Sequence, residues 1–461
     1  MAAIQNKKYK VNMCEGPLLK QIIVFAIPLM MTSLLQLFFH AADLIVVGKY
    51  ASHEALAAVG ATASLSGLIV NLFFGLSVGA NVVVARLIGE NNRIKIFHAT
   101  HTAITISLIG GIILSFIGII FSKNFLKMMD TPEEILGLST LYMQINFAGM
   151  PIAMFYHFGS AILRSIGDTK RPFYFLTIAG IVNVILNMFF VIVCHWSVGG
   201  VATATVASQV LSAFMILQVL TKSRETYRID LKRLHIHWET LKEMMRIGIP
   251  TGFQGACFSL ANILIQAAIN SFGATAVAGN TAAMTVETIG YVSIAAIGQS
   301  TLTFTSQNYG GKQYHRIRDV IKYTIMLSVV CSIIVCITLY ILRYWEMSLF
   351  TDNTEVVIWG IDRLKILLPV YFICGIMDVI TNGLRGLGYS ISPTIIMILG
   401  ICVFRIVWIK TVFASSHTLL SILITFPFSW IIVIIACGTL LYKVLQKMPK
   451  HNQKLISQNA D

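Results

Sequence analysis

Several carboxylates lie in long apolar stretches of the chain, where an ionised acid is energetically costly, and three of them are candidates for chemistry. They are Asp43, Glu287 and Asp378. A charged side chain at the centre of a bilayer costs roughly 2.5–3.5 kcal/mol on insertion scales. Acids in such surroundings are therefore candidates for binding a proton, a metal cation or a cationic ligand.

Asp43 is the first candidate for ion binding. It lies late in an apolar run that begins at residue 18, with His40 one turn earlier. Loss of hydration there favours the neutral acid, so the side chain could take up and release a proton. Two alternatives remain open: a carboxylate fixed by a structural hydrogen bond, or one that meets water at the outer boundary.

Two further ionisable residues occupy matched positions in a later pair of segments. Asp378 precedes Arg385 by seven residues, and His157 precedes Arg164 by the same interval. Asp378 is either a cation ligand or the partner of a buried arginine. His157 is either a proton relay or a side chain bonded to a backbone carbonyl. We expect Arg405 to pair with a buried acid.

Glu287 and several amides form a second polar set. Glu287 is a candidate for binding a cationic substrate, with a salt bridge as the alternative. Gln254, Asn262 and Asn280 are candidates for lining a substrate cavity, with hydrogen bonding between helices as the alternative.

Composition identifies the elements that must position these residues. Hydrophobic residues make up 56% of the 461-residue chain and charged residues 12%. A soluble domain usually has about 25% charged residues, so lipid is the expected solvent. Apolar segments long enough to span a bilayer recur throughout. We predict an all-α membrane protein with twelve transmembrane helices, at 18–46, 55–82, 97–121, 136–162, 172–194, 199–221, 244–270, 277–305, 319–342, 359–384, 393–413 and 418–443.

The loops between these spans are asymmetric in charge. If the N-terminus is cytoplasmic, most of the 34 lysines and arginines fall on the cytoplasmic side, as the positive-inside rule requires. Few fall outside, among them Arg363 and Lys365. We therefore predict a multi-pass protein with both termini in the cytoplasm. This topology accounts for the net charge of +14, which gives no reason to expect a nucleic-acid partner.

The chain contains an internal repeat. Residues 163–167 (LRSIG) match 384–388 (LRGLG), and Pro172 matches Pro393 at the same offset. A gene-fusion remnant is one interpretation; two bundles that line a V-shaped substrate cleft are the other. The predicted organisation is a six-helix bundle at 1–221, a cytoplasmic linker at 222–243, a pseudo-symmetric six-helix bundle at 244–443 and a cytoplasmic tail at 444–461.

Two prolines occupy matched positions at the start of each half. Pro28 and Pro250 interrupt the first and seventh predicted helices. A proline frees a backbone carbonyl and permits bending. Helix bending during function is one interpretation, and a fixed kink is the other.

Several short segments together resemble a known family. They are 42–48 (ADLIVVG) around Asp43, the two repeated segments at 163–167 and 384–388, 183–187 (NVILN), 248–250 (GIP) and 306–311 (SQNYGG). Their order and spacing resemble the multidrug and toxic compound extrusion (MATE) family, in its DinF-like bacterial branch, from about residue 17 to 445. The resemblance implies efflux of small organic, often cationic compounds across the bacterial inner membrane by a monomer. It also implies H⁺ or Na⁺ as the coupling ion and no other cofactor.

The same resemblance suggests partners for Asp43. The family's cation site uses an asparagine followed four residues later by an aspartate; this chain has Asn183 and Asn187 at those positions. Thr205 matches a further polar position of that site. Because the second acid is missing, the resemblance slightly favours H⁺ over Na⁺.

Two other classes of function compete with export. A lipid-linked precursor flippase shares the tandem architecture, but usually needs a markedly basic cavity, and Arg405 is the main basic residue at depth. A membrane enzyme is not expected, because no DDxxD or HExxH motif and no ATP-binding P-loop occurs, and the one GxSxG match, at 75–79, lies inside a predicted transmembrane span. The eight cysteines form no CxxC pair, so neither a metal site nor a disulfide framework is predicted.

Overall fold

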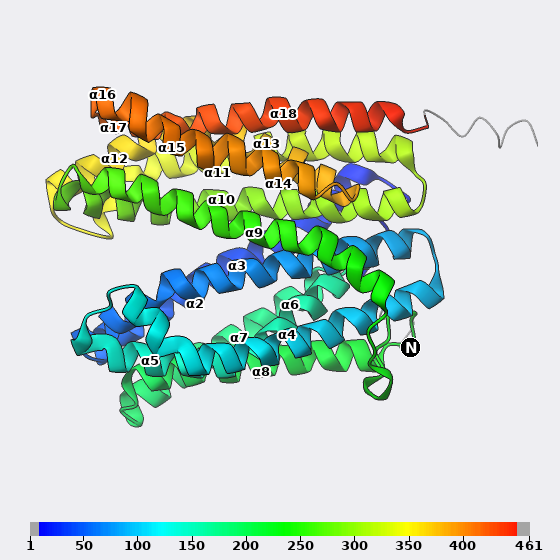
Figure 1. The fold of residues 1–461 in the computed structure, drawn as a ribbon, viewed down its shortest axis with the longest axis horizontal. Coiled ribbons are helices and arrows are strands. Elements are labelled where there is room, and N and C mark those ends of the chain that lie inside the picture. The colour runs from blue at the N-terminus through cyan, green and yellow to red at the C-terminus, as the bar shows by residue number, and fades with distance from the viewer. Residues whose placement is uncertain (1–8, 450–461) are drawn as a thin grey trace, which may run out of the picture. The chain divides into compact units, whose positions relative to one another are not determined.

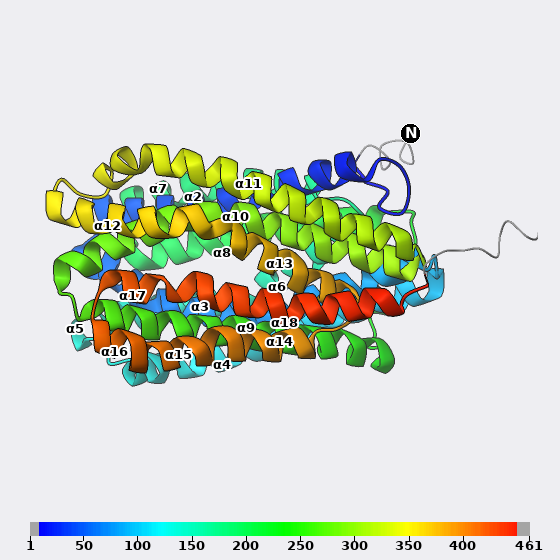
Figure 2. The same cartoon turned by 90° about the horizontal axis from the view of Figure 1, so that it is seen from above.

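The computed structural model describes residues 9–449, and its regular elements there are all helical (Figures 1 and 2). The fold class predicted from the apolar runs is confirmed. The first half contains α2 (Leu18–Tyr50), α3 (His53–Gly89), α4 (Arg93–Met128), α5 (Glu133–Ala148), α6 (Met150–Ser165), α7 (Lys170–Met188), a π-helical stretch (Phe189–Val193) and α8 (Ser197–Lys222).

The second half repeats this order with more interruptions. It contains α9 (Trp238–Asn270), α10 (Ala274–Gly310), α11 (Tyr314–Ser348), α12 (Thr354–Leu367), α13 (Tyr371–Gly386), α14 (Ile391–Met397), α15 (Phe404–Trp408), α16 (Ala414–Ser416), α17 (Leu419–Leu423) and α18 (Thr425–Lys447). Short 3₁₀ or π-helical stretches lie at Leu231–Arg233, Leu368–Val370, Ile398–Val403 and Ile409–Phe413.

Helix starts show the internal repeat directly. The first residues of α3 and α10, His53 and Ala274, differ by 221 positions, and the first residues of α4 and α11 differ by the same amount. The repeated LRxxG segments end α6 and α13. Their glycines, Gly167 and Gly388, have φ of 89° and 90°. Only glycine adopts this conformation without strain, which explains its place in both copies.

The helices are long and apolar enough to cross a bilayer. Eleven helical segments of the described residues meet this condition, with α12 and α13 joined as the single segment Thr354–Gly386. The helices α5 and α6 cover the remaining predicted span, 136–162, and are separated at Gly149. Pro151 follows this break, where its missing N–H is not needed.

The described residues form two compact units. One consists of residues 9–11 and 31–252, and the other of residues 12–30 and 253–449. Two helices, α2 and α9, therefore contribute to both units. Each changes unit just after its proline, since the divisions follow Met30 and Gly252 while the prolines are Pro28 and Pro250.

Small residues attach the beginning of α9 to the first unit. A Cβ added to Gly75 on α3 would lie 2.2 Å from the backbone nitrogen of Gly252, and one on Gly79 would lie 2.3 Å from the carbonyl oxygen of Met244. Side chains are thus excluded where the two backbones meet. Close approach through glycines is a common way of packing helices in lipid, where no hydrophobic effect drives their association.

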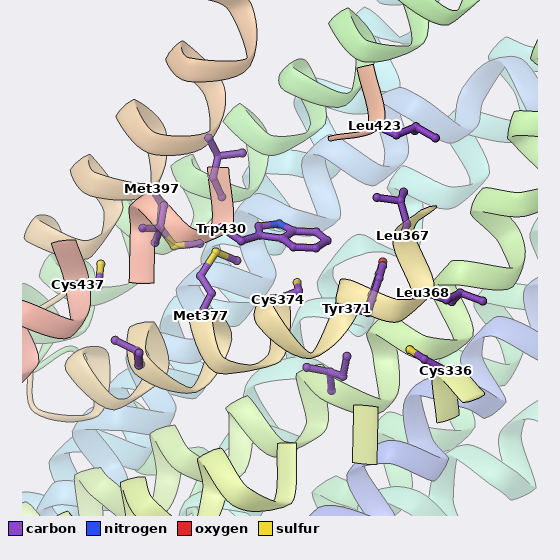
Figure 3. Close-up of a cluster of buried hydrophobic side chains, with 14 of the residues drawn as sticks. Cys336, Leu367, Leu368, Tyr371, Cys374, Met377, Met397, Leu423, Trp430 and Cys437 are labelled. Atoms are coloured by element: carbon purple, nitrogen blue, oxygen red, sulfur yellow. The ribbon is translucent and has the colours of Figure 1, made fainter. Parts of the chain in front are cut away.

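The core of the second unit is centred on α13. This helix packs against α10, α11 and α18. Tyr371, Cys374 and Met377 face Trp430 of α18 in a buried apolar cluster (Figure 3). The aromatic rings of Tyr371 and Trp430 meet edge to face, with their centroids 5.6 Å apart. This core fixes the orientation of the polar residues that α13 also carries.

Candidate functional site

Asp43 is buried in the first unit. The residue is 9% exposed and lies on the part of α2 that follows Met30. Val46 and Val47, on the same helix, pack in a small apolar cluster with residues of α3 and α8, among them Val59 and Val198. These contacts hold α2 so that the carboxylate is removed from water.

Two other helices bring polar groups to this carboxylate. Nδ2 of Asn187 on α7 donates a hydrogen bond to Oδ1 of Asp43, and the same Nδ2 lies 3.4 Å from Oδ1 of Asn183. Nδ2 of Asn183 lies 3.4 Å from Oγ1 of Thr205 on α8. The two asparagines share a helix face because they are four residues apart. The structure thus brings together the four residues predicted for ion coupling; their role in coupling stays a prediction.

The groups around Asp43 are arranged as donors to an ionised acid. The amide nitrogen of Asn187 faces the carboxylate, while its Oδ1 has no hydrogen-bond partner among the described residues. No second carboxylate completes the site, and the described residues contain no group of three histidine, cysteine or acidic side chains with the geometry of a metal site. The arrangement can hold a carboxylate and accept a proton on it. Direct Na⁺ binding would require amide oxygens to turn toward the ion.

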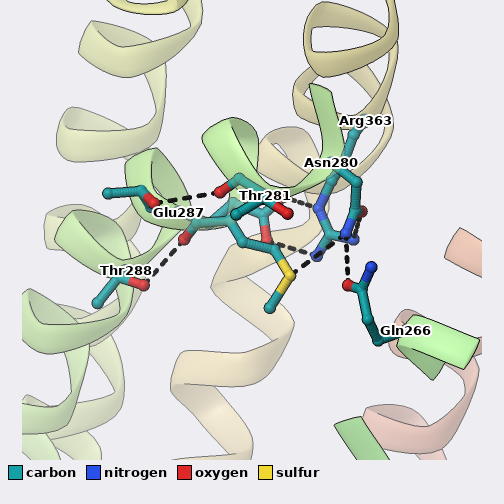
Figure 4. Close-up of polar contacts among 8 residues, drawn as sticks. Gln266, Asn280, Thr281, Glu287, Thr288 and Arg363 are labelled. Atoms are coloured by element: carbon teal, nitrogen blue, oxygen red, sulfur yellow. Dashed lines mark hydrogen bonds and ion pairs between the residues drawn. The ribbon is translucent and has the colours of Figure 1, made fainter. Parts of the chain in front are cut away.

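Glu287 is held by a buried salt bridge in the second unit (Figure 4). Its two carboxylate oxygens accept bonds from Nε and Nη2 of Arg363 on α12, at 2.8 and 2.9 Å. Oδ1 of Asn280 accepts from Nη1 of the same guanidinium at 2.6 Å, and Nδ2 of Asn280 donates to Gln266 at 3.0 Å. The arginine is 2% exposed. This geometry supports the salt-bridge alternative for Glu287.

The position of Arg363 corrects the predicted topology. The loop-charge analysis assigned Arg363 to the outer side, although the predicted span 359–384 already includes this residue. The helix α12 begins at Thr354, and Arg363 lies on it as a buried residue. Helical periodicity could have predicted the burial of Arg363, because this residue lies on the same helix face as Val356, Gly360 and Leu367, which are also buried.

The amides predicted to line a cavity in the second half each bind an arginine. All three arginines are buried, with at most 6% exposure. The guanidinium donates to the amide oxygen in each case, which supports the alternative in which these amides bond helices together. The pairs are Arg363 with Asn280, Arg385 with Gln254 and Arg405 with Asn262.

The expectation that Arg405 pairs with a buried acid is wrong. Ion pairs among the described residues include neither Arg405 nor Arg385. The guanidinium of Arg405 instead lies 4.2 Å from the centroid of the Phe426 ring and 3.4 Å from Oγ of Ser429. A cation over an aromatic face gains about 2 kcal/mol when it is shielded from water.

Asp378 and His157 have different surroundings, although the repeat aligns them. The carboxylate of Asp378 lies against Gly298 of α10, where an added Cβ would be 1.9 Å from Oδ2. The His157 ring packs edge to face with Phe74 and Tyr156. The roles proposed for Asp378 and His157 stay predictions.

Comparison with known proteins gives a consistent result. The chain matches the family model described as MatE over residues 28–189 and 250–409. The probable multidrug resistance protein YoeA of Bacillus subtilis is 26% identical over 387 residues, which is 82% of this chain and 83% of YoeA. The FAD transporter of Shewanella oneidensis is 23% identical over 447 residues, 94% of this chain and 97% of that protein.

Solved structures share the fold over nearly the whole length. The outward-facing structure of a multidrug resistance MATE family transporter of the MOP superfamily superposes with a TM-score of 0.88 at 23% identity. The alignment covers 95% of this chain and 98% of that one. The twelve-helix architecture predicted from the sequence is thus shared with an experimentally determined transporter.

Proposed function

This chain belongs to the MatE family of membrane transporters, and we propose that it exports small organic compounds in exchange for an inward-moving cation. The buried Asp43 with its amide and hydroxyl neighbours is the observation that carries the proposal. The Asp43 carboxylate can gain or lose its charge by binding a cation. It is surrounded by amide and hydroxyl groups whose hydrogen bonds depend on that charge. Export then proceeds by alternate exposure of a substrate path, and binding of the cation at Asp43 favours the state from which substrate leaves.

We propose H⁺ rather than Na⁺ as the coupling ion. Asn187 presents its amide N–H₂ to Asp43, a geometry that suits an ionised carboxylate awaiting a proton. A site for Na⁺ would present several oxygens to the ion. No other cofactor is required by this mechanism.

The driving force depends on the charge of the cargo. At about 150 mV, one inward charge supplies roughly 3.5 kcal/mol. For a monovalent cation exchanged against one H⁺ the electrical terms cancel, so only the pH gradient drives export. A neutral compound would use the voltage as well.

We propose that the protein is a monomer in the bacterial cell (inner) membrane, as the family resemblance implies, with both termini in the cytoplasm, as the loop charges predict. The cargo class is supported by the relatives' names: YoeA is a probable multidrug resistance protein and another relative transports FAD. A panel of probes should therefore include aromatic cations and aromatic anions.

Everted membrane vesicles test the proposal when the two ion gradients are imposed separately. With a fluorescent monovalent cation as probe, we expect uptake into vesicles that are acidic inside, and none when an inside-high Na⁺ gradient is imposed alone. Collapsing the membrane potential with a K⁺ ionophore should leave the rate unchanged, because the exchange is electroneutral. Uptake driven by Na⁺ alone would overturn the choice of ion, and uptake indifferent to both gradients would overturn antiport.

Pro28 is proposed to permit bending of α2 during this cycle. The helix changes unit just after it. We expect Pro28→Ala to lower the rate of export severalfold and to flatten its dependence on pH, while thermal stability rises or stays unchanged, because alanine restores the helical hydrogen bond. Unchanged transport and an unchanged pH profile would favour a fixed kink.

A lipid-linked precursor flippase is the second candidate. It is favoured by Arg405, a buried guanidinium that has no acid as an ion-pair partner among the described residues. An anionic pyrophosphate could compensate such a charge. Saturable binding of an undecaprenyl-pyrophosphate lipid to the purified protein, weakened at least tenfold by Arg405→Gln, would establish this function in place of drug export.

A further inference from the structure

The segment between α8 and α9 is docked on the first turns of α4. It belongs, like α4, to the first unit. The sequence predicted a cytoplasmic linker here but no contact that would hold it. Four hydrogen bonds do so, two of them through histidine rings: Asp230 N to His101 Nε2 at 3.0 Å, His98 Nδ1 with His235 Nε2 at 2.7 Å, His237 N to Thr102 Oγ1 at 2.9 Å, and Thr105 Oγ1 to the carbonyl oxygen of His235 at 3.5 Å.

The hydrogen-bond partners of the His101 ring determine which of its two nitrogens carries a hydrogen. Its Nδ1 lies 2.8 Å from the carbonyl oxygen of Phe97. A carbonyl can only accept, so Nδ1 carries a hydrogen. Its Nε2 accepts the backbone N–H of Asp230, so Nε2 carries none. The ring is therefore neutral as long as the linker is docked.

His235 is bound differently. Its Nδ1 lies 2.9 Å from the carbonyl oxygen of Arg233 and must carry a hydrogen. Its Nε2 lies 2.7 Å from Nδ1 of His98, and either ring can be the donor in that bond. The docked linker therefore needs one neutral imidazole as acceptor, that of His101 on α4.

Few other charges face these rings. The His98 ring stacks on the His237 ring at 4.8 Å, and the His101 ring lies 5.8 Å from that of His235. Protons on these rings would therefore repel one another. The acid nearby is Asp230, whose carboxylate pairs with Arg233 at 3.5 Å and accepts from the backbone of Lys232. The Asp230 carboxylate therefore already has its partners within the linker itself.

We propose that this linker is a pH-operated latch, docked on α4 while His101 is neutral and released when His101 is protonated. A proton on Nε2 of His101 replaces an acceptor by a donor that faces the backbone N–H of Asp230. An imidazole in water has a pKa of about 6.5, so with the linker released His101 takes up a proton that it refuses while the linker is docked. This site shifts the ratio of docked to released linker by up to tenfold per pH unit below that value.

The linker joins α8 to α9, so its release frees this connection from α4. The latch does not depend on which ion drives transport or on which cargo is carried.

Hydrogen–deuterium exchange of the full chain in lipid nanodiscs tests the latch. Peptides covering residues 224–240 should exchange at least tenfold faster at pH 5.5 than at pH 7.5 after correction for intrinsic exchange. Peptides from the middle of α4 should not change. Equal protection of the linker at both pH values would overturn the proposal, and this measurement needs no variant.

Matched variants separate the histidines from their surroundings. His101→Gln places an amide oxygen where Nε2 accepts, so the linker should stay protected at pH 5.5. Asp230→Asn keeps the backbone N–H and should leave the pH response intact, as should His315→Gln, an exposed histidine at the start of α11. A pH response that survives His101→Gln, or that disappears in Asp230→Asn, would assign the sensor elsewhere.

Discussion

Asp43→Asn is expected to abolish ion-coupled export while leaving the protein folded in the membrane. Asparagine has the same shape as aspartate but cannot gain or lose a proton, so the driving ion no longer changes the charge at the site. The neighbouring Asn187 can still hydrogen-bond to the new amide oxygen. Because a costly buried charge is removed, thermal stability should be unchanged or higher. We expect the initial rate of gradient-driven export to fall at least 100-fold.

The measurement compares probe uptake by everted vesicles containing equal amounts of each protein. Asp362→Asn is the matched control, because Asp362 also lies on a transmembrane helix but is half exposed and pairs with Lys365 at 3.1 Å. It should transport normally. Binding of the probe to purified Asp43→Asn should persist, since the site binds the ion rather than the cargo. Full coupled export by this variant would remove Asp43 from the mechanism.

Glu287→Gln is expected to destabilise the folded protein strongly, and this loss of stability should not depend on whether cargo is bound. The substitution leaves the Arg363 guanidinium buried without its counter-charge, and breaking a buried ion pair in this way typically costs 3–5 kcal/mol. The thermal midpoint of the detergent-solubilised protein should fall clearly. Arg363→Met on its own should be similarly harmful, because it leaves the acid unpaired.

The double substitution Glu287→Met with Arg363→Met is the informative comparison. Two apolar side chains of similar volume remove both charges and should recover most of the lost stability. Asp362→Asn breaks an exposed pair and should cost at most about 1 kcal/mol. If Glu287→Gln kept the thermal midpoint but lost export of a cationic probe, Glu287 would instead be a substrate ligand.

Apolar run length and loop charge were sufficient to predict the helical membrane fold. Lipid forces each crossing segment to satisfy its own backbone hydrogen bonds, so a run of about 20 apolar residues has essentially one outcome. Side assignment near helix ends was less certain: Arg363 was counted as an outer charge although the predicted span already included it, and it lies buried on α12. The grouping of Asn183 with Asn187 followed from their spacing, whereas their proximity to Asp43 and Thr205 came from family resemblance.

Contacts between distant polar residues could not be predicted from the sequence. Asn280 and Arg363 are joined across 83 positions, and Gln254 and Arg385 across 131. Periodicity places such residues on a face but does not say which partner occupies the facing helix. The docking of the linker on α4 was hidden for the same reason: a polar, basic stretch is compatible equally with a free loop and with one bonded to a helix surface.

The sharing of α2 and α9 has a consequence for the independence of the two halves. Residues 12–30 complete the second unit although they precede the first, and residues 238–252 complete the first although they begin the second. Each half thus lends the other a short helical piece, as in a reciprocal domain swap. Fragments separated within the linker would each lack an interior surface and should be stable only when produced together.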